Sequence, residues 1–117
     1  MTKYPHLFTS LKVGNLTMRN RIEASATSLQ IWAPGDRLTR ESIAYYERKA
    51  KGGAAMVIIG ETPVERNSGK SHVHMLHLDD PEIIYNLGYV TEAIHKHGAI
   101  ASLQIAHGGA GFDPAIL

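Results

Sequence analysis

The pattern of hydrophobic and polar positions along this chain predicts a series of strands and helices that follow one another. Residues 9–18 alternate around Gly14-Asn15, which predicts a small β-hairpin. Residues 22–26 predict a short strand, and the following Ala33-Pro34-Gly35-Asp36 predicts a turn or loop. The first third of the chain therefore reads as a hairpin, a strand and a loop.

A helix and a buried strand are predicted next. Thr39 is a suitable N-cap, basic residues occupy the last turn, and Gly52-Gly53 ends the helix. The residues expected on its apolar face are Ile43, Tyr46 and Ala50. The continuous apolar run at residues 54–59 ends at Gly60 and is typical of a strand covered on both faces, as in a parallel sheet.

Residues 60–80 are polar and irregular, and a second helix is predicted after them. Asp79-Asp80-Pro81 places an acidic cap before a proline at the first helical position, and Gly98 closes the helix. Its predicted apolar stripe consists of Ile84, Leu87, Val90 (or Thr91) and Ile94. A third strand is expected at residues 100–105.

The order hairpin, strand, helix, strand, helix, strand predicts an α/β fold with right-handed β-α-β units and a parallel sheet. Two architectures fit: a small doubly wound domain, or the N-terminal portion of a (β/α)8 barrel. Such a barrel needs about 250 residues, so residues 1–117 would supply three of its eight strands. A three-stranded sheet also leaves two open edges, which favours self-association.

Composition and charge narrow the classes of function. The chain has 117 residues, 44% of them hydrophobic, and a net charge of +1, which does not indicate a nucleic-acid-binding protein. It has no cysteine, which excludes disulfides, thiolate metal sites and a catalytic thiol. No apolar run is long enough to cross a bilayer and the N-terminus does not resemble a secretion signal, so we expect a cytoplasmic protein.

Polar residues at the predicted strand ends are the candidates for a site. Gln104 interrupts the third strand near its end, and His107 with two glycines follows. A side-chain amide can pair with a heterocycle that carries C=O and N–H groups, although a glutamine bonded to neighbouring backbone is the alternative. Ligands of α/β sheets bind beyond the carboxyl ends of strands, which favours a site here.

Two further patterns are weighed and set aside. Residues 67–71 end like a phosphate-binding loop, but the first glycine of that motif is absent, and residues 108–111 lack dinucleotide spacing. His72, His74 and His77 suggest a metal site, yet no carboxylate stands at a recognised spacing. We therefore favour solvated loop histidines over a metal site, and keep a His-rich metal-binding domain as an alternative.

Three segments together resemble the N-terminal part of the old yellow enzyme family, in particular its NADH:flavin oxidoreductase and 2,4-dienoyl-CoA reductase branch. The segments are LFTSLKVGNLTMRNRI, GDRLTRESIAYYERKAKGGAAMVIIGETPV and LDDPEIIYNLGYVTEAIHKHGAIASLQIAHGG, and they cover essentially the whole chain. The resemblance implies a flavin-bearing TIM barrel with a hairpin across its N-terminal end.

The resemblance also implies site residues and cofactors. The FMN contacts map onto Ala26, Thr27, Ser28, Glu61 and Gln104, with Gln104 on the pyrimidine edge of the flavin and His107 on the substrate side. In the family, NAD(P)H is the reductant, and longer members carry FAD and a 4Fe-4S cluster in regions outside this chain. Here His107 is not followed by the family's usual arginine.

The expected function is that of an FMN-dependent NAD(P)H oxidoreductase in the full-length protein, reducing an activated C=C bond of a small-molecule substrate. The proton donor and the phosphate-binding loops of the family have no counterpart in these residues, so we expect the fragment alone to be inactive. A non-enzymatic β-α-β binding module is the other alternative.

Overall fold

The computed structural model describes residues 3–29, 32–33, 36–111 and 115. Three parallel strands form the central sheet in the order β3-β6-β7. They are β3 (Glu23–Thr27), β6 (Met56–Pro63) and β7 (Ile100–Ala106). The helices are α1 (Arg40–Lys51), α2 (Arg66–Gly69) and α3 (Ile83–His95), with short 3-10 turns at Pro5–Phe8 and Gly109–Gly111. The predicted strand-helix alternation and parallel pairing are confirmed.

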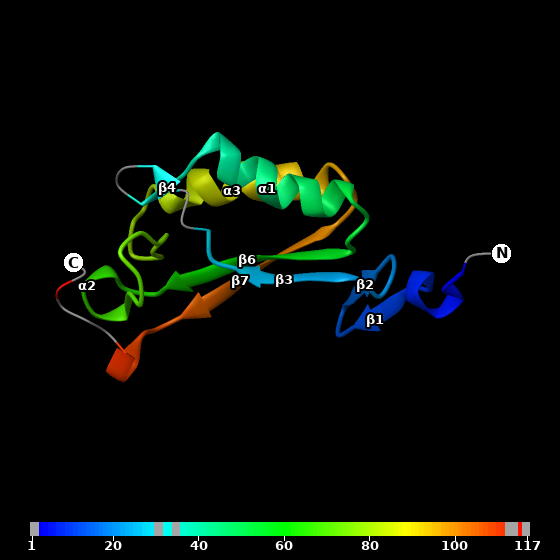
Figure 1. The fold of residues 1–117 in the computed structure, drawn as a ribbon, viewed down its shortest axis with the longest axis horizontal. Helices are drawn as coiled ribbons and strands as arrows, with labels where there is room; N and C mark the ends of the chain where they lie inside the picture. Colours follow the sequence, from blue (N-terminus) through cyan, green and yellow to red (C-terminus); the bar gives the residue numbers. More distant parts are fainter. Residues whose placement is uncertain (1–2, 30–31, 34–35, 112–114, 116–117) are drawn as a thin grey trace.

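The elements form two layers, with α1 and α3 together on one face of the sheet (Figure 1). A hairpin of β1 (Leu11–Val13) and β2 (Leu16–Met18) lies at the amino ends of the strands, and α2 lies at their carboxyl ends (Figure 1). Within the described residues, no element covers the other face of the sheet or pairs with the outer edges of β3 and β7. Self-association through these edges stays a prediction.

Helix α1 forms as its sequence predicts. The Thr39 hydroxyl accepts a hydrogen bond from the Ser42 amide at 3.1 Å, and Gly52 is the C-cap. Tyr46 and Ala50 are buried and Ile43 packs beside them, so the predicted apolar face is correct.

Helix α3 begins two residues later than predicted, because Pro81 and Glu82 form a turn closed by Asp80. The Asp80 carboxylate accepts the amide of Glu82 and pairs with the Arg37 guanidinium, which holds Pro81 in a turn ahead of the helix. As a result Ile83 is buried while Ile84 is 71% exposed, so placing Ile84 in the apolar stripe was wrong. The rest of that stripe is confirmed.

The end of β6 and the segment around residues 33–36 also differ from prediction. Strand β6 continues past Gly60 to Pro63, because it keeps pairing with β7 as far as Pro63 opposite Ala106. Around the predicted turn at residues 33–36, β4 (Trp32–Ala33) pairs with β5 (Arg37–Leu38) as a two-stranded ribbon. Residues 34 and 35 of that turn lie outside the described part.

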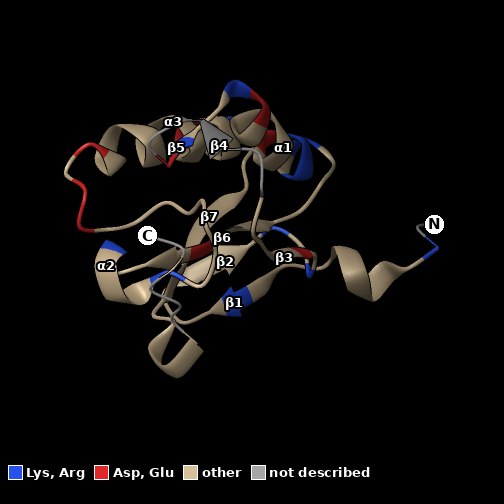
Figure 2. Ribbon diagram, turned by 60° about the vertical axis from the view of Figure 1, so that its left-hand side comes forward, with Lys and Arg blue, Asp and Glu red and all other residues tan. Residues whose placement is uncertain are grey.

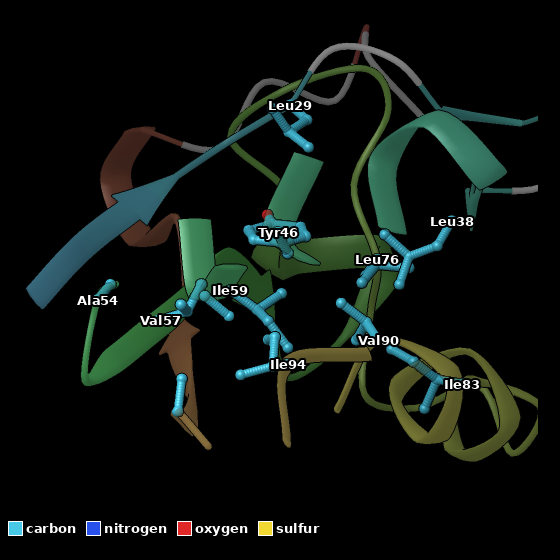
Figure 3. Packing of buried hydrophobic residues seen from close by; sticks show 12 residues of the cluster. Leu29, Leu38, Tyr46, Ala54, Val57, Ile59, Leu76, Ile83, Val90 and Ile94 are labelled. Carbon is cyan, nitrogen blue, oxygen red and sulfur yellow. The ribbon is translucent and has the colours of Figure 1, made fainter. Parts of the chain in front are cut away.

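The core lies between the helices and the sheet, with Tyr46 among the aliphatic side chains (Figure 3). Its fully buried members include Val57 and Ile59 of β6, Val90 and Ile94 of α3, and Leu76 of the loop between α2 and α3, while β3 and β7 contribute partly buried side chains. None of the helices in the described ranges is long and apolar enough to cross a membrane.

Arg19 connects the helices to the amino ends of the strands. Its guanidinium donates to the carbonyl oxygens of His97 at 2.6 Å, Ala50 at 3.1 Å and Ala54 at 2.9 Å. One side chain therefore bonds to the last turn of α1, to the residue that follows the α3 C-cap and to the segment that leads into β6. This fixes the helix layer over the sheet whose opposite ends carry the candidate site.

Candidate functional site

The carboxyl ends of β3, β6 and β7 form one rim, because the three strands are parallel neighbours. Both strand pairs change register near this rim. In β3, Ser25 and Ala26 stand opposite the single residue Ile58 of β6. In β6, Gly60 and Glu61 stand opposite the single residue Gln104 of β7. Such bulges re-aim side chains and are common at barrel rims and beside active sites.

Gln104 faces away from the helices. Its neighbour Leu103 packs against the core, and successive strand residues point to opposite faces of a sheet. The Gln104 side chain is exposed and makes no hydrogen bond within the described residues. Within the described residues the alternative of a core or edge glutamine bonded to backbone has no such bond to support it, and the role of Gln104 toward a ligand stays a prediction.

The end of β3 lies close against β6. A Cβ atom built on Gly60 would stand 2.2 Å from the Thr27 carbonyl oxygen, so only glycine allows this approach. The Thr27 hydroxyl donates to the Ser25 carbonyl at 3.3 Å, while Ser28 is exposed at the rim. Thr27 and Ser28 thus stand beside Gly60 of β6, and β6 separates them from Gln104 on β7.

Glu61 belongs to the rim, but its carboxylate is engaged. Oε1 accepts a hydrogen bond from the Ser71 hydroxyl at 2.9 Å, and Oε2 lies 3.9 Å from His72 Nε2. The side chain is therefore held by the loop after β6, which favours a contribution of this residue through its backbone.

His107 is braced against the same loop. Its Nδ1 accepts the Gly109 amide at 3.0 Å, so in the neutral ring the proton lies on Nε2, which is 3.3 Å from Ser68 Oγ. Glu65 caps α2 and accepts the Ser68 hydroxyl. The Gly108 amide donates to the Gly69 carbonyl at 2.8 Å. These bonds hold the turn after β7 against α2, and the substrate-side role of His107 stays a prediction.

A buried ion pair joins the loops that follow β3 and β6. Lys70 Nζ is 2.5 Å from Asp36 Oδ2, and the two side chains are 2% and 5% exposed. His74 Nδ1 lies 3.4 Å from the other Asp36 oxygen. Burial raises the pKa of Asp36, but Lys70 and His74 outweigh this, so the pKa of the carboxyl lies below its ordinary value.

The three loop histidines contact three different carboxylates. His72 lies near Glu61, His74 near Asp36, and His77 Nδ1 is 2.6 Å from Asp79 Oδ1. Asp79 also belongs to the acidic segment that leads into α3 (Figure 2). Among the described residues, no three histidine or acidic side chains are placed to hold a metal ion. The metal-binding alternative therefore has no ligand set in this part of the chain.

Sequence reasoning missed the Lys70–Asp36 pair, the Ser68–His107 contact and the hydroxyl of Tyr46, which reaches the rim from α1. The first two join residues 34 and 39 positions apart, so no local pattern indicates them.

Comparison with known proteins shows what the chain and its fold resemble. The chain matches the model of the NADH:flavin oxidoreductase / NADH oxidase family over residues 6–114. It is 32% identical to the NADH oxidase of Thermoanaerobacter brockii, over 99% of this chain and 18% of that protein. It is 35% identical to the N,N-dimethylglycine/sarcosine dehydrogenase of Chromohalobacter salexigens, over 95% of this chain and 17% of that protein. The chain therefore spans less than a fifth of these curated relatives.

Solved structures agree with this match. A 2-naphthoyl-CoA reductase superposes with a TM-score of 0.89 at 26% identity, over 96% of this chain and 17% of that one. The old yellow enzyme from Trypanosoma cruzi gives 0.84 at 25% identity, over 97% of this chain and 30% of that one. The two β/α units and the third strand thus have the arrangement of the N-terminal part of such a TIM barrel, and the described residues do not close a barrel.

Proposed function

Because the chain belongs to the NADH:flavin oxidoreductase / NADH oxidase family, we propose that its strand rim holds the ring of FMN in an NAD(P)H-dependent oxidoreductase. The observation that carries the proposal is the exposed Gln104 amide opposite the bulge at Gly60-Glu61. A side-chain amide presents one acceptor and two donors. This set matches the alternating C=O and N–H groups of a flavin pyrimidine edge.

The rest of the rim fits a flat ring. Ala26 and Thr27, with small or short side chains, end β3, Ser28 follows it, and Gly60 lies beside Thr27 in β6. Neighbouring strands lie about 4.8 Å apart, so β3 and β7 are about 10 Å apart on either side of β6. We propose that Gln104 holds the pyrimidine edge, while the backbone at Thr27 and Glu61 faces the rest of the ring.

When bound, FMN supplies the two-electron chemistry by which NAD(P)H reduces a second substrate. The residues of this chain orient the ring and hydrogen-bond its edge. We propose an activated C=C bond of a small molecule as the acceptor, as the old yellow enzyme likeness suggests. An FAD domain and an iron–sulfur cluster would lie outside residues 1–117, which contain no cysteine to ligate a cluster.

We further propose that the 117-residue chain alone does not turn over NAD(P)H. The three described strands would contact a flavin ring on one side only. No element of the described residues covers the sheet face on which Gln104 lies. A cytoplasmic location stays a prediction.

The test is flavin binding to the 117-residue chain, measured through the change in flavin fluorescence. FMN and lumiflavin, which lacks the ribityl phosphate, should bind with similar affinity, because the proposed contacts are to the ring. Gln104→Leu should weaken both about tenfold, as expected for one lost hydrogen bond of about 1.4 kcal/mol. Asn67→Leu removes an exposed amide from α2 instead and should change neither affinity. Equal affinities of the native and Gln104→Leu chains would contradict the proposal.

A further inference from the structure

A hydroxyl from the helix layer stands between two strands at the candidate site. Tyr46 lies on α1, is 1% exposed, and reaches the sheet with its oxygen. That oxygen donates to the Thr27 carbonyl at 3.0 Å and accepts the Gly60 amide at 3.2 Å. One atom therefore bonds to both β3 and β6.

These bonds stand where the ladder between the strands is interrupted. The regular pairing of β3 with β6 runs through Ala24 opposite Val57, and resumes only with Thr27 opposite Ile59. Buried backbone groups at such a break must find another partner. The Tyr46 hydroxyl supplies it, accepting from one strand and donating to the other as a hydroxyl can.

We propose that Tyr46 is a positioning residue that sets the separation of β3 and β6 at the rim, and thereby the wall of the flavin site. This rests on the proposed function. The hydroxyl holds the Thr27 carbonyl on one side, while the bare Cα of Gly60 lets the Thr27–Ser28 peptide approach from the other. The backbone next to the proposed ring is thus held at two points.

The protonation state of Tyr46 is consistent with this role. Burial raises the pKa of its hydroxyl above the ordinary value, although the bond from the Gly60 amide lowers it in part. The hydroxyl therefore keeps its proton at neutral pH and can donate to Thr27.

The experiment compares three variants of the 117-residue chain. Tyr46→Phe removes only the oxygen. Val90→Ala makes a cavity in the same core, since Val90 is fully buried on α3, and lowers stability without touching the ladder. Tyr85→Phe removes a hydroxyl from a side chain that is 70% exposed. Amide chemical shifts and amide hydrogen exchange are measured without flavin, and lumiflavin affinity is measured separately.

In Tyr46→Phe, the amide shifts of Gly60 and Ser28 should move, and Gly60 should exchange faster than global unfolding explains. Lumiflavin affinity should fall about fivefold or more, as for one lost hydrogen bond at the site. Val90→Ala should change neither the rim shifts nor the affinity while its urea midpoint falls, and Tyr85→Phe should match the native chain.

Two results overturn the proposal: a Gly60 amide that is unchanged in Tyr46→Phe, or a Val90→Ala chain that loses lumiflavin affinity as Tyr46→Phe does. If the native chain binds no lumiflavin, the proposed function fails. The role of Tyr46 in strand separation is then decided by the amide data alone, which support it if Gly60 and Ser28 respond and overturn it if they do not.

Discussion

Replacing Lys70 by methionine should destabilise the chain far more than replacing any exposed lysine. Lys70 and Asp36 are 2% and 5% exposed and 2.5 Å apart, so removing the cation leaves a buried carboxylate without its main partner. Breaking a buried ion pair in this way costs about 3–5 kcal/mol. His74, 3.4 Å from Asp36 and 55% exposed, offsets part of this loss when it is protonated.

The matched control is Lys96→Met. Lys96 is 70% exposed and 3.5 Å from Glu47, and exposed pairs of this kind contribute about 0–1 kcal/mol. Urea unfolding followed by circular dichroism at pH 7 gives both differences.

A double-mutant cycle isolates the pair. Asp36 has φ 59°, and Asn tolerates this left-handed conformation, so Asp36→Asn changes the charge and spares the backbone. The double variant Lys70→Met/Asp36→Asn should be more stable than the sum of the two single losses predicts, because the second change removes a charge already left unpaired. A Lys70→Met loss no greater than that of Lys96→Met would refute the assignment of a buried pair.

The same pair predicts a pH dependence. The pKa of Asp36 lies below its ordinary value of 3.8, with burial opposing and Lys70 and His74 favouring the charged form. Its stabilisation is therefore present above about pH 4 and is lost as pH falls through the folded-state pKa. The difference in unfolding free energy between the native chain and Asp36→Asn should shrink as the pH falls below about 4.

Four further substitutions test the fold around the site by urea unfolding. Gly60→Ala should lower the free energy of unfolding by about 3 kcal/mol, because the added Cβ would overlap the Thr27 carbonyl. Gly88→Ala, which has open space around the new Cβ, should instead stabilise α3 by about 0.5–1 kcal/mol. Equal effects of the two substitutions would contradict the close approach of β3 and β6 at Gly60. Thr39→Ala should cost about 1 kcal/mol by removing the N-cap of α1, and no loss would show that the cap is unimportant. Arg19→Met should cost about 2–3 kcal/mol because three carbonyls lose a charged donor, and a loss below 0.5 kcal/mol, the range of ordinary surface changes, would contradict that role.

Elements with a strong local pattern could be predicted from the sequence. The Gly14-Asn15 hairpin, helix α1 with its Thr39 cap, and the parallel pairing of three strands follow from period, turn chemistry and the order of elements. The placement of Gln104 at a strand end followed from the same reasoning.

The remaining features depend on contacts between distant segments. The start of α3 is set by Asp80, whose partner Arg37 lies 43 residues earlier. At each of the two bulges, one strand has one residue more than the neighbouring strand over the same stretch. The sequence of a single strand does not reveal this difference. The roles of Tyr46 and Lys70 depend on burial in the folded chain, so their chemistry was not visible as a motif.

The central claim is that the carboxyl tips of three parallel strands surround one flavin ring. It is tested most directly by intermolecular NOEs between lumiflavin and the isotopically labelled chain. We predict NOEs to residues 26–28, to Gly60-Glu61 and to the Gln104 side-chain amide, from all three strands at once. NOEs confined to the outer surface between α1 and α3, near Glu47 and Tyr89, or to one strand alone, would contradict it.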